Sequence, residues 1–310
     1  MSDFDKFLMA QVGFIAALIL SPLIPGIINR TKAVFAGRQG PPLLQLYYDL
    51  FKLLRKGAVY SNTTTWVFRA APIVSLSAVI GVLMLIPCTG ATPALISFQG
   101  DIIFFAYLFG ISRFFTVTAA LDTGSAFEGM GASREVLYAA LAEPAFLIAL
   151  SSLACLNNQI SITGIFIAST ANPFANIAVI LLVAVTLTIV LLTENCRVPA
   201  DDPNTHLELT MIHEVMVLDY GGSDLAYILY GSALKLWAFA SILVAIVLPA
   251  RTGSLFLDSA VFVGGIFIVA VIVGVIESTM ARFRLDKIPK MLIAAAALSA
   301  TALLLTITRG

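Results

Sequence analysis

The amino-acid sequence predicts an all-α polytopic membrane protein with about eight transmembrane helices, because its apolar residues fall into runs of about 20, the length that crosses a bilayer. Of its 310 residues, 59% are hydrophobic and 12% are charged, whereas soluble domains carry about 25% charged residues. The mean hydropathy of +0.98 supports the same class. We therefore interpret residues 1–310 as a single transmembrane domain with no independent soluble domain.

The predicted spans follow the apolar runs. They cover residues 7–28, 67–88, 102–120, 134–156, 174–193, 225–248, 260–281 and 291–308. Pro22 and Pro25 predict a kink at the inner end of the first span, since proline interrupts the helical hydrogen-bond pattern. The start of the chain, MSDFDK, is acidic and no small-residue cleavage pattern follows it, so we expect a retained first span and not a signal peptide.

Two polar stretches precede the middle of the chain. Residues 29–66 are predicted to form a cytoplasmic loop with an interfacial amphipathic helix, because Gln45, Asp49, Lys52 and Lys56 fall on one helical stripe opposite leucines and aromatic residues. Anchoring to the bilayer and lining a site are alternative roles for this helix. Residues 121–135 are predicted to form a glycine-rich loop, which is not a phosphate loop because no Gly-Lys-Ser/Thr follows.

The distribution of basic residues predicts the orientation of the spans. If both termini lie on the outer side, Lys6, Arg251 and Arg309 are outside and Lys235 lies within a span, so the other fourteen of the eighteen Lys and Arg residues lie inside. Because cytoplasmic loops are enriched in Lys and Arg, we expect both termini outside.

Residues 195–224 are predicted to form an acidic cytoplasmic loop. Between Leu191 and Gly222 the chain holds Arg197, both of its histidines (His206 and His213) and six of its eighteen acidic residues. Ionisable groups in or beside a membrane are costly unless paired or hydrated, so such a group of residues predicts a functional site.

Charges also lie within the predicted spans. Glu143 lies about 13 Å along its helix from Arg134, Lys235 is near the middle of its span, and Glu277 is near the end of another. Carboxylates in such places can pass protons through bridging water. The predicted proton path consists of Glu143, Glu194, Asp201, Glu208, His213, Glu214, Asp219, Lys235 and Glu277. Solvated surface acids and a buried structural ion pair are the alternative interpretations.

The sequence predicts no metal or cofactor bound by this chain. Cys88, Cys155 and Cys196 are isolated, so they do not form a cysteine cluster for iron–sulfur or zinc. His213-Glu214 begins the zinc-protease pattern H-E-x-x-H, but residue 217 is Val and the second histidine is missing. A metal bound by His206, His213 and a carboxylate is the alternative.

Several motifs resemble one family over essentially the whole chain. They are residues 38–45 with Asp49 and Lys52, 121–125 with 131–135, Glu143-Pro144, 194–222 and 277–286. On these residues the chain resembles the membrane subunit shared by respiratory complex I, where it is subunit 1 of NADH:quinone oxidoreductase, and by energy-converting NiFe hydrogenases. Leu-Asp-Thr-Gly-Ser and Gly-Ala-Ser-Arg-Glu are similar to the formate hydrogenlyase subunit 4 branch.

The resemblance implies a non-catalytic, eight-helix anchor and coupling subunit of a group 4 NiFe-hydrogenase or formate hydrogenlyase-like complex in the cytoplasmic membrane of a prokaryote. It implies a hydrogenase-like large subunit, an iron–sulfur small subunit and antiporter-like membrane subunits as partners, with iron–sulfur clusters and the Ni-Fe centre in those partners. The implied docking or cavity residues are Arg38, Asp49, Lys52, Arg134, Arg197, Arg282, Arg284 and Asp286. The transported ion would be a proton or a sodium ion.

Two other functions are compatible with the sequence. The first is a quinone-cavity subunit of a complex I-type NADH dehydrogenase, although this chain has Asn204 and His206 at positions where the complex I protein carries carboxylates. The second is a stand-alone secondary ion transporter. A transporter would be stable and active when expressed alone, whereas a subunit would depend on its complex.

Overall fold

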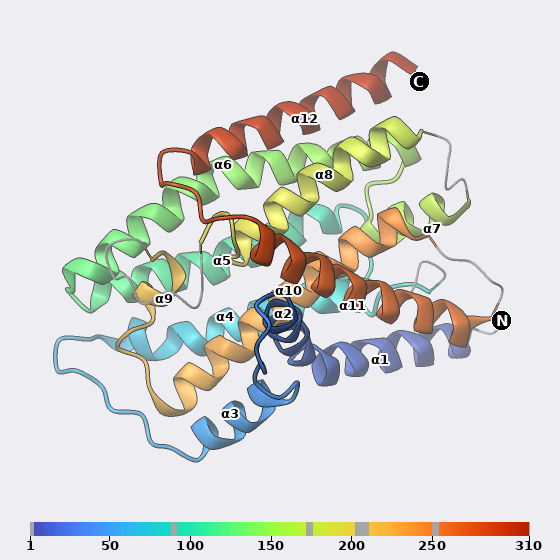
Figure 1. Cartoon of the computed structure of the whole chain (residues 1–310). Helices are drawn as coiled ribbons and strands as arrows, with labels where there is room; N and C mark the ends of the chain where they lie inside the picture. The colour runs from blue at the N-terminus through green and yellow to red at the C-terminus, as the bar shows by residue number, and fades with distance from the viewer. Residues whose placement is uncertain (1–2, 88–91, 172–175, 202–210, 250–253, 310) are drawn as a thin grey trace.

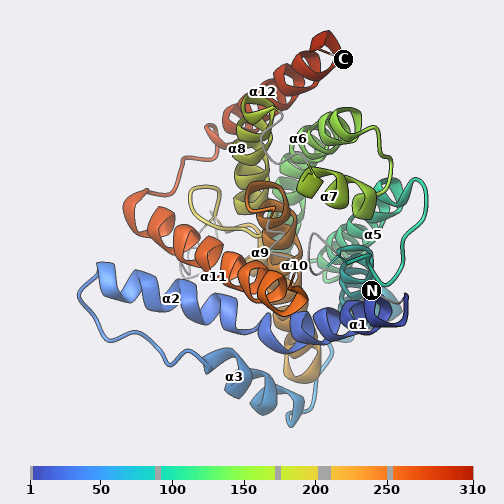
Figure 2. The same ribbon diagram turned by 90° about the vertical axis from the view of Figure 1, so that its right-hand side faces the viewer.

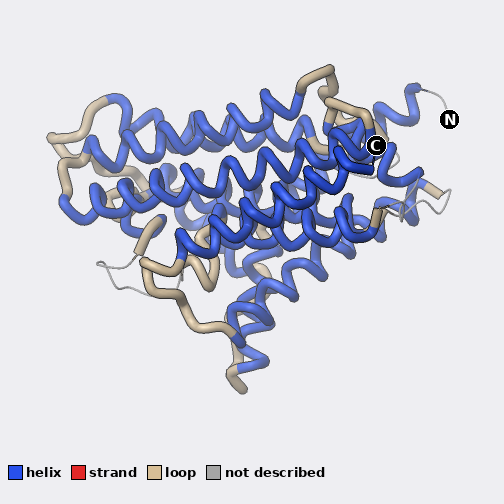
Figure 3. The backbone as a smooth tube through the Cα atoms, turned by 90° about the horizontal axis from the view of Figure 1, so that it is seen from above, coloured by secondary structure: helices blue, strands red, loops and turns tan. Residues whose placement is uncertain are grey.

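The computed structural model describes residues 3–87, 92–171, 176–201, 211–249 and 254–309, and every regular element in them is a helix (Figure 3). The helices are α1 (Asp3–Leu20), α2 (Leu23–Phe35), α3 (Gln45–Leu54), α4 (Trp66–Leu85), α5 (Asp101–Asp122), α6 (Ala126–Asn157), α7 (Ile162–Ala171), α8 (Ile177–Glu194), α9 (His213–Met216), α10 (Gly222–Val247), α11 (Leu255–Thr279) and α12 (Ile288–Arg309).

Seven of the described helices are long and apolar enough to cross a membrane, namely α4, α5, α6, α8, α10, α11 and α12. Helices α1 and α2 provide an eighth span if they count as one, with a bend of 48° between them. Pro22 lies at this break, as the predicted kink requires. The predicted all-α polytopic membrane fold is therefore confirmed.

The start of α1 and the end of α12 lie at the same end of the helix bundle (Figure 1). An even number of spans has this consequence, and α1 with α2 counted as one span makes the number even. The assignment of that end to the outer side of the membrane stays a prediction from the distribution of Lys and Arg.

Helix α10 lies at the centre of the bundle and provides much of the core (Figure 1). Every residue from 236 to 246 is buried, and Lys235 directly precedes this run. Phe239 of α10 stacks on Phe109 of α5, with ring centroids 5.1 Å apart, and meets Phe146 of α6 edge-on at 5.6 Å. This aromatic contact fixes α5, α6 and α10 relative to one another just beside the polar centre described below.

The glycine-rich stretch 121–135 is largely helical, so the predicted loop is wrong. The turn is confined to 123–125, where Gly124 has a φ of +72°, and α6 begins at Ala126. Gly131 has a packing role inside the helix, because a Cβ there would lie 2.8 Å from the carbonyl oxygen of Ile212. The absent side chain lets α6 approach the segment around α9 closely.

Helices α2 and α3 extend sideways from the rest of the bundle (Figure 2). Helix α2 continues to Phe35, further than the predicted end of the first span at residue 28. Helix α3 falls within the predicted amphipathic segment and has no buried residue. We call residues 30–56 the basic arm, after the Lys and Arg residues that it carries.

Candidate functional site

Arg113 of α5 lies at the centre of three carboxylates from two other helices. Its Nη2 donates to both oxygens of Glu194, at 2.6 and 2.7 Å. Its Nη1 donates to Glu143, and its Nε lies 3.6 Å from Oε1 of Glu135. The arginine side chain is mostly buried, so these contacts replace the water that a guanidinium group would otherwise require.

Lys235 of α10 completes what we call the Arg113 centre, which consists of Arg113, Glu135, Glu143, Glu194 and Lys235. Its Nζ donates to Oε2 of Glu194 at 2.8 Å. When all groups are ionised, three carboxylates and two cations leave a net charge of −1. One proton or one monovalent cation would neutralise the centre, which is the property expected of an ion relay.

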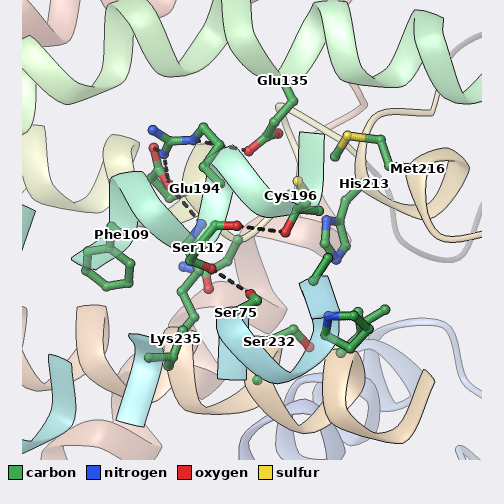
Figure 4. Close-up of a pocket in the computed structure, with 18 of the residues that line it drawn as sticks. Ser75, Phe109, Ser112, Glu135, Glu194, Cys196, His213, Met216, Ser232 and Lys235 are labelled. Atoms are coloured by element: carbon green, nitrogen blue, oxygen red, sulfur yellow. Dashed lines mark hydrogen bonds and ion pairs between the residues drawn. The ribbon is translucent and has the colours of Figure 1, made fainter. Parts of the chain in front are cut away.

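A small cavity of about 90 Å³, with several polar side chains on its wall, adjoins the Arg113 centre. Ser75 and Ser112 lie on its wall with their Oγ atoms 2.6 Å apart, and His213 and Cys196 line it as well (Figure 4). The volume is sufficient for several water molecules, since one needs only about 10–15 Å³ of such space. Hydroxyl groups can both donate and accept, so this wall can support a hydrogen-bonded water chain.

A second cavity of about 400 Å³ lies on the other side of the centre, between α5, α6, α8 and α10. Ile103, Tyr107 and Leu147 line it and are substantially exposed, so it opens on the lateral surface of the helix bundle. Glu143 also lines it and has a side chain that is 49% exposed, compared with 7% for Glu194. Glu143 is therefore the carboxylate through which the centre reaches the lateral surface.

Glu277 lies in a different group of contacts. Its carboxylate is fully buried, 2.8 Å from Nζ of Lys32 in α2 and 3.5 Å from Nη1 of Arg197. Gly274 permits this approach of α11 to α2, because a Cβ there would lie 2.7 Å from the side chain of Thr31. Glu277 thus links the base of the basic arm to the segment that follows α8.

Asp201 joins three segments at the end of the bundle that is predicted to be the inner one. Its Oδ1 lies 2.7 Å from Arg282, and its Oδ2 accepts the backbone N–H of Ile212 at 2.9 Å. Nearby, the N–H of Phe283 donates to the carbonyl of Pro199 at 2.9 Å. Arg282 was predicted to dock a partner, but its guanidinium group is used within the chain because Asp201 is buried beside it.

The other predicted docking residues differ in exposure. Arg134 donates to the carbonyl of Met211 at 3.0 Å, within the chain. Arg284 is 84% exposed and lies 3.4 Å from Asp286, so both remain accessible. Arg38 and Lys52 are exposed on the basic arm, and Asp49 accepts a hydrogen bond from Gln45 at 2.9 Å.

His213 and Cys196 meet the small cavity from outside the spans. Burial, assisted by the ammonium group of Lys235, lowers the pKa of His213 to about 4, so its imidazole is neutral near pH 7. Burial and nearby carboxylates raise the pKa of the Cys196 thiol, which is therefore not a reactive thiolate. Glu214 follows His213 in α9 and is partly buried.

The structure does not place the alternative metal site at His206 and His213, nor the predicted path residue Glu208. Glu208 and His206 lie outside the described residues. Within the described part of the chain, no three His, Cys, Asp or Glu side chains are arranged to hold a metal ion.

Known proteins match this chain over nearly its whole length. The family described as NADH dehydrogenase matches residues 8–308. The chain belongs to the NADH dehydrogenase family. Formate hydrogenlyase subunit 4 of Escherichia coli (strain K12) is 29% identical over 286 residues, which are 89% of this chain and 92% of that protein. Hydrogenase-4 component C of the same organism is 30% identical over 289 residues, 90% of this chain and 88% of that protein.

A solved structure shares the fold of this NADH dehydrogenase family member. It is a chain of the membrane-bound sulfane sulfur reductase, an archaeal respiratory membrane complex, with a TM-score of 0.82 and 22% identity. The match covers 97% of this chain and 99% of that chain. The predicted resemblance is therefore confirmed, both for the family and for its hydrogenase relatives.

The predicted proton path divides into several groups in this family member. Glu143, Glu194 and Lys235 meet at Arg113, whereas Glu277 meets Lys32 and Arg197. Asp201 meets Arg282, and the backbone N–H of Asp219 donates to buried Glu128 at 3.3 Å. Burial explains the division, since each buried carboxylate is held by the donor that its own helix packing provides.

Arg113, Glu135, Lys32 and Glu128 were not among the predicted site residues. The distribution of basic residues assigns Arg113 to the inner side, although it lies within the apolar run 102–120, about 18 Å along α5 from Asp101. The depth of Arg113 in this apolar run is the sequence feature that identifies it as a site residue, because an arginine inside a span requires acidic partners.

Proposed function

We propose that this chain is the non-catalytic membrane anchor and coupling subunit of a multisubunit NiFe-hydrogenase or formate hydrogenlyase-like complex in the cytoplasmic membrane of a prokaryote. The similarity to formate hydrogenlyase subunit 4 and hydrogenase-4 component C supports this class of complex. The redox chemistry would occur in partner subunits that carry the iron–sulfur clusters and the Ni-Fe centre.

The observation that carries the proposal is the charge of the Arg113 centre. Three carboxylates share one arginine and one lysine inside the spans, so the fully ionised centre has an excess charge of −1. A purely structural ion-pair network would be stabilised by equal numbers of opposite charges. The excess charge supports a centre that gains and loses one proton, or one sodium ion, during the coupling cycle.

The two cavities suggest the route of the ion. The serine-lined cavity at His213 would deliver it from the inner side to Glu194 and Lys235. Glu143 would pass it on, because it is the half-exposed carboxylate at the lateral cavity. The lateral cavity is mostly apolar beyond Glu143, so the route would continue through antiporter-like membrane subunits packed against α5 and α6.

A proton relay is better supported than a quinone-cavity role. The described inner cavity has a volume of about 90 Å³, suited to several waters rather than to a quinone with its isoprenoid tail. The changes at Asn204 and His206 remove carboxylates from the sequence that corresponds to the quinone-cavity wall.

Glu143→Gln tests the coupling role. The substitution keeps the shape and removes the titrating charge, so assembly and hydrogenase turnover with a soluble artificial electron partner should continue. Ion translocation in sealed vesicles should fall by about tenfold or more, the scale for loss of a proton-transfer group. Asp122→Asn, at a carboxylate that accepts from Thr65 and lines neither cavity, is the control and should translocate normally.

The outcome separates the alternatives. Unchanged translocation in Glu143→Gln would remove Glu143 from the route, and failure to assemble would identify it as a structural partner of Arg113. Copurification with the tagged chain tests the complex itself: hydrogenase-like and iron–sulfur subunits should be recovered. A chain that is stable and transports ions alone would instead be a stand-alone transporter.

A further inference from the structure

The basic arm carries a strong excess of positive charge. It contains Arg30, Lys32, Arg38, Lys52, Arg55 and Lys56 but a single acidic residue, Asp49. Lys32 is paired with Glu277, which leaves five basic residues and one acid, a net charge of +4. These five side chains belong to exposed residues, and the ion pairs found among the described residues involve none of them.

The arm also exposes a continuous apolar stripe. Leu44, the N-cap residue of α3, and Tyr48 and Phe51 within the helix follow one another at spacings of four and three residues, so they lie on one face. Each is about half exposed or more: Leu44 45%, Tyr48 60% and Phe51 59%. Leu54, one further turn along, is 53% exposed.

The side of α3 opposite the stripe faces the bundle, since Leu46, Leu50 and Leu53 on it are only partly exposed, and Tyr47 at the edge of the stripe adds a hydrogen bond. The hydroxyl of Tyr47 donates to the backbone carbonyl of Ile19, at the end of α1. Gly222, with a φ of +55°, lets the start of α10 approach the end of the arm, since a Cβ there would lie 2.6 Å from the carbonyl of Gly57. The stripe on the free face is therefore held in a fixed orientation, away from the core.

We infer that the basic arm binds anionic phospholipids, with its apolar stripe in the acyl region and its basic side chains at the headgroup phosphates. The apolar stripe is complementary to the acyl chains of such a lipid, and the basic side chains are complementary to its phosphate group. Arg55 already bridges them, because its guanidinium group lies 3.9 Å from the centroid of the Phe51 ring. Its aliphatic stem can follow the apolar face while its charge reaches the phosphate.

A lipid fits this surface better than a water-soluble partner subunit. The stripe belongs to a multi-pass membrane protein and lies beside the spans, where aromatic residues are characteristic of the membrane interface. The inference goes beyond the proposed function, and its test requires neither ion translocation nor hydrogenase activity.

The test places p-benzoylphenylalanine at position 51 of the full chain, within its assembled complex. The complex is reconstituted in vesicles of phosphatidylcholine with a minor fraction of phosphatidylglycerol, irradiated, and analysed for adducts on this chain by mass spectrometry. The expected result is lipid adducts in which phosphatidylglycerol is enriched over its share of the vesicle.

Removal of the charges supplies the decisive comparison. Since each Lys or Arg near a surface contributes about fivefold to the preference for anionic lipid, Lys52→Gln, Arg55→Gln and Lys56→Gln together should reduce the enrichment tenfold or more. The matched control is the double variant Lys287→Gln, Lys290→Gln, which removes two basic side chains at the start of α12. This control should leave the enrichment of phosphatidylglycerol unchanged. High salt should weaken the enrichment in the unmodified arm, which supplies an independent measurement if the triple variant does not assemble.

Two results would overturn the inference. Adducts in the proportion of the vesicle lipids, unchanged by the triple variant or by salt, would make the arm a non-selective apolar anchor. A covalent adduct with a partner subunit in place of lipid would make the stripe a protein interface.

Discussion

Nη2 of Arg113 donates to both carboxylate oxygens of Glu194, at 2.6 and 2.7 Å, and so ties α5 to α8 inside the membrane. The same carboxylate accepts from Nζ of Lys235 at 2.8 Å, so Glu194 is held by two cations at once. Among the ion pairs of the described residues, Glu135 and Glu143 contact Arg113 alone, through its Nε and Nη1 atoms. The centre is therefore rigid at Glu194 and has its spare charge on α6.

This arrangement predicts unequal effects of neutralising substitutions. Arg113→Gln should destabilise the assembled subunit by about 3–5 kcal/mol, because it leaves three carboxylates with one lysine. Glu194→Gln should cost less, since two carboxylates and two cations remain. The loss in the double variant should be smaller than the sum of the two single losses. Thermal denaturation of the purified complex measures all three, and an Arg113→Gln complex as stable as the unmodified one would contradict the account.

A second prediction concerns the close packing of α6 against α9. Gly131→Ala should destabilise the protein by about 1–3 kcal/mol, because its Cβ would meet Val215 and Ile212 and force them apart. Gly129→Ala is the matched control in the same turn: a Cβ there has nothing within 4 Å. That substitution should stabilise α6 by up to about 1 kcal/mol, through helix propensity alone. Equal effects of the two substitutions would show that α6 does not pack closely here.

The third prediction separates docking from folding in the segment after α11. Arg282→Glu should destabilise the chain by about 3–5 kcal/mol, because it sets a second acid beside buried Asp201. Arg284→Glu should leave stability unchanged, since that side chain is 84% exposed. If this face docks the peripheral subunits, Arg284→Glu alone should release them from membranes. Retention of all peripheral subunits in that variant would remove Arg284 from the docking surface.

A fourth prediction follows from the lowered pKa of His213, which is about 4 in the folded chain and about 6.5 when exposed. Between these values the unfolded state holds more protons, so stability should rise with pH through this window and be constant above it. Acidification from pH 7 to pH 5 should cost about 2 kcal/mol from this group.

His213→Gln should flatten that part of the pH profile of thermal stability. His206→Gln, at the only other histidine in the sequence, is the control and should keep the full dependence. A profile that is unchanged in His213→Gln would show that other groups cause the acid sensitivity.

The spans could be predicted from the sequence because length and hydropathy alone determine them. The start of α6 could not, since Gly129 and Gly131 lower helix propensity and the compensating contact with α9 is a tertiary feature. The partners of individual charges were equally inaccessible: Glu143 and Glu194 are 30 and 81 residues from Arg113 in the sequence. The depth of an isolated charge is visible in a sequence, whereas the identity of its counter-ion depends on helix packing.

The order in which the Arg113 centre is built follows the order of synthesis. Arg113 reaches the membrane with α5, before any of the carboxylates has been made, and the two on α6 are the first that can pair with it. Glu194 and then Lys235 arrive later, with α8 and α10. A chain that stops early, or that fails to insert a helix, thus retains an incompletely paired arginine within the bilayer. The charges that would move an ion in the finished subunit therefore destabilise an incomplete chain in the membrane, because they lack their partners there.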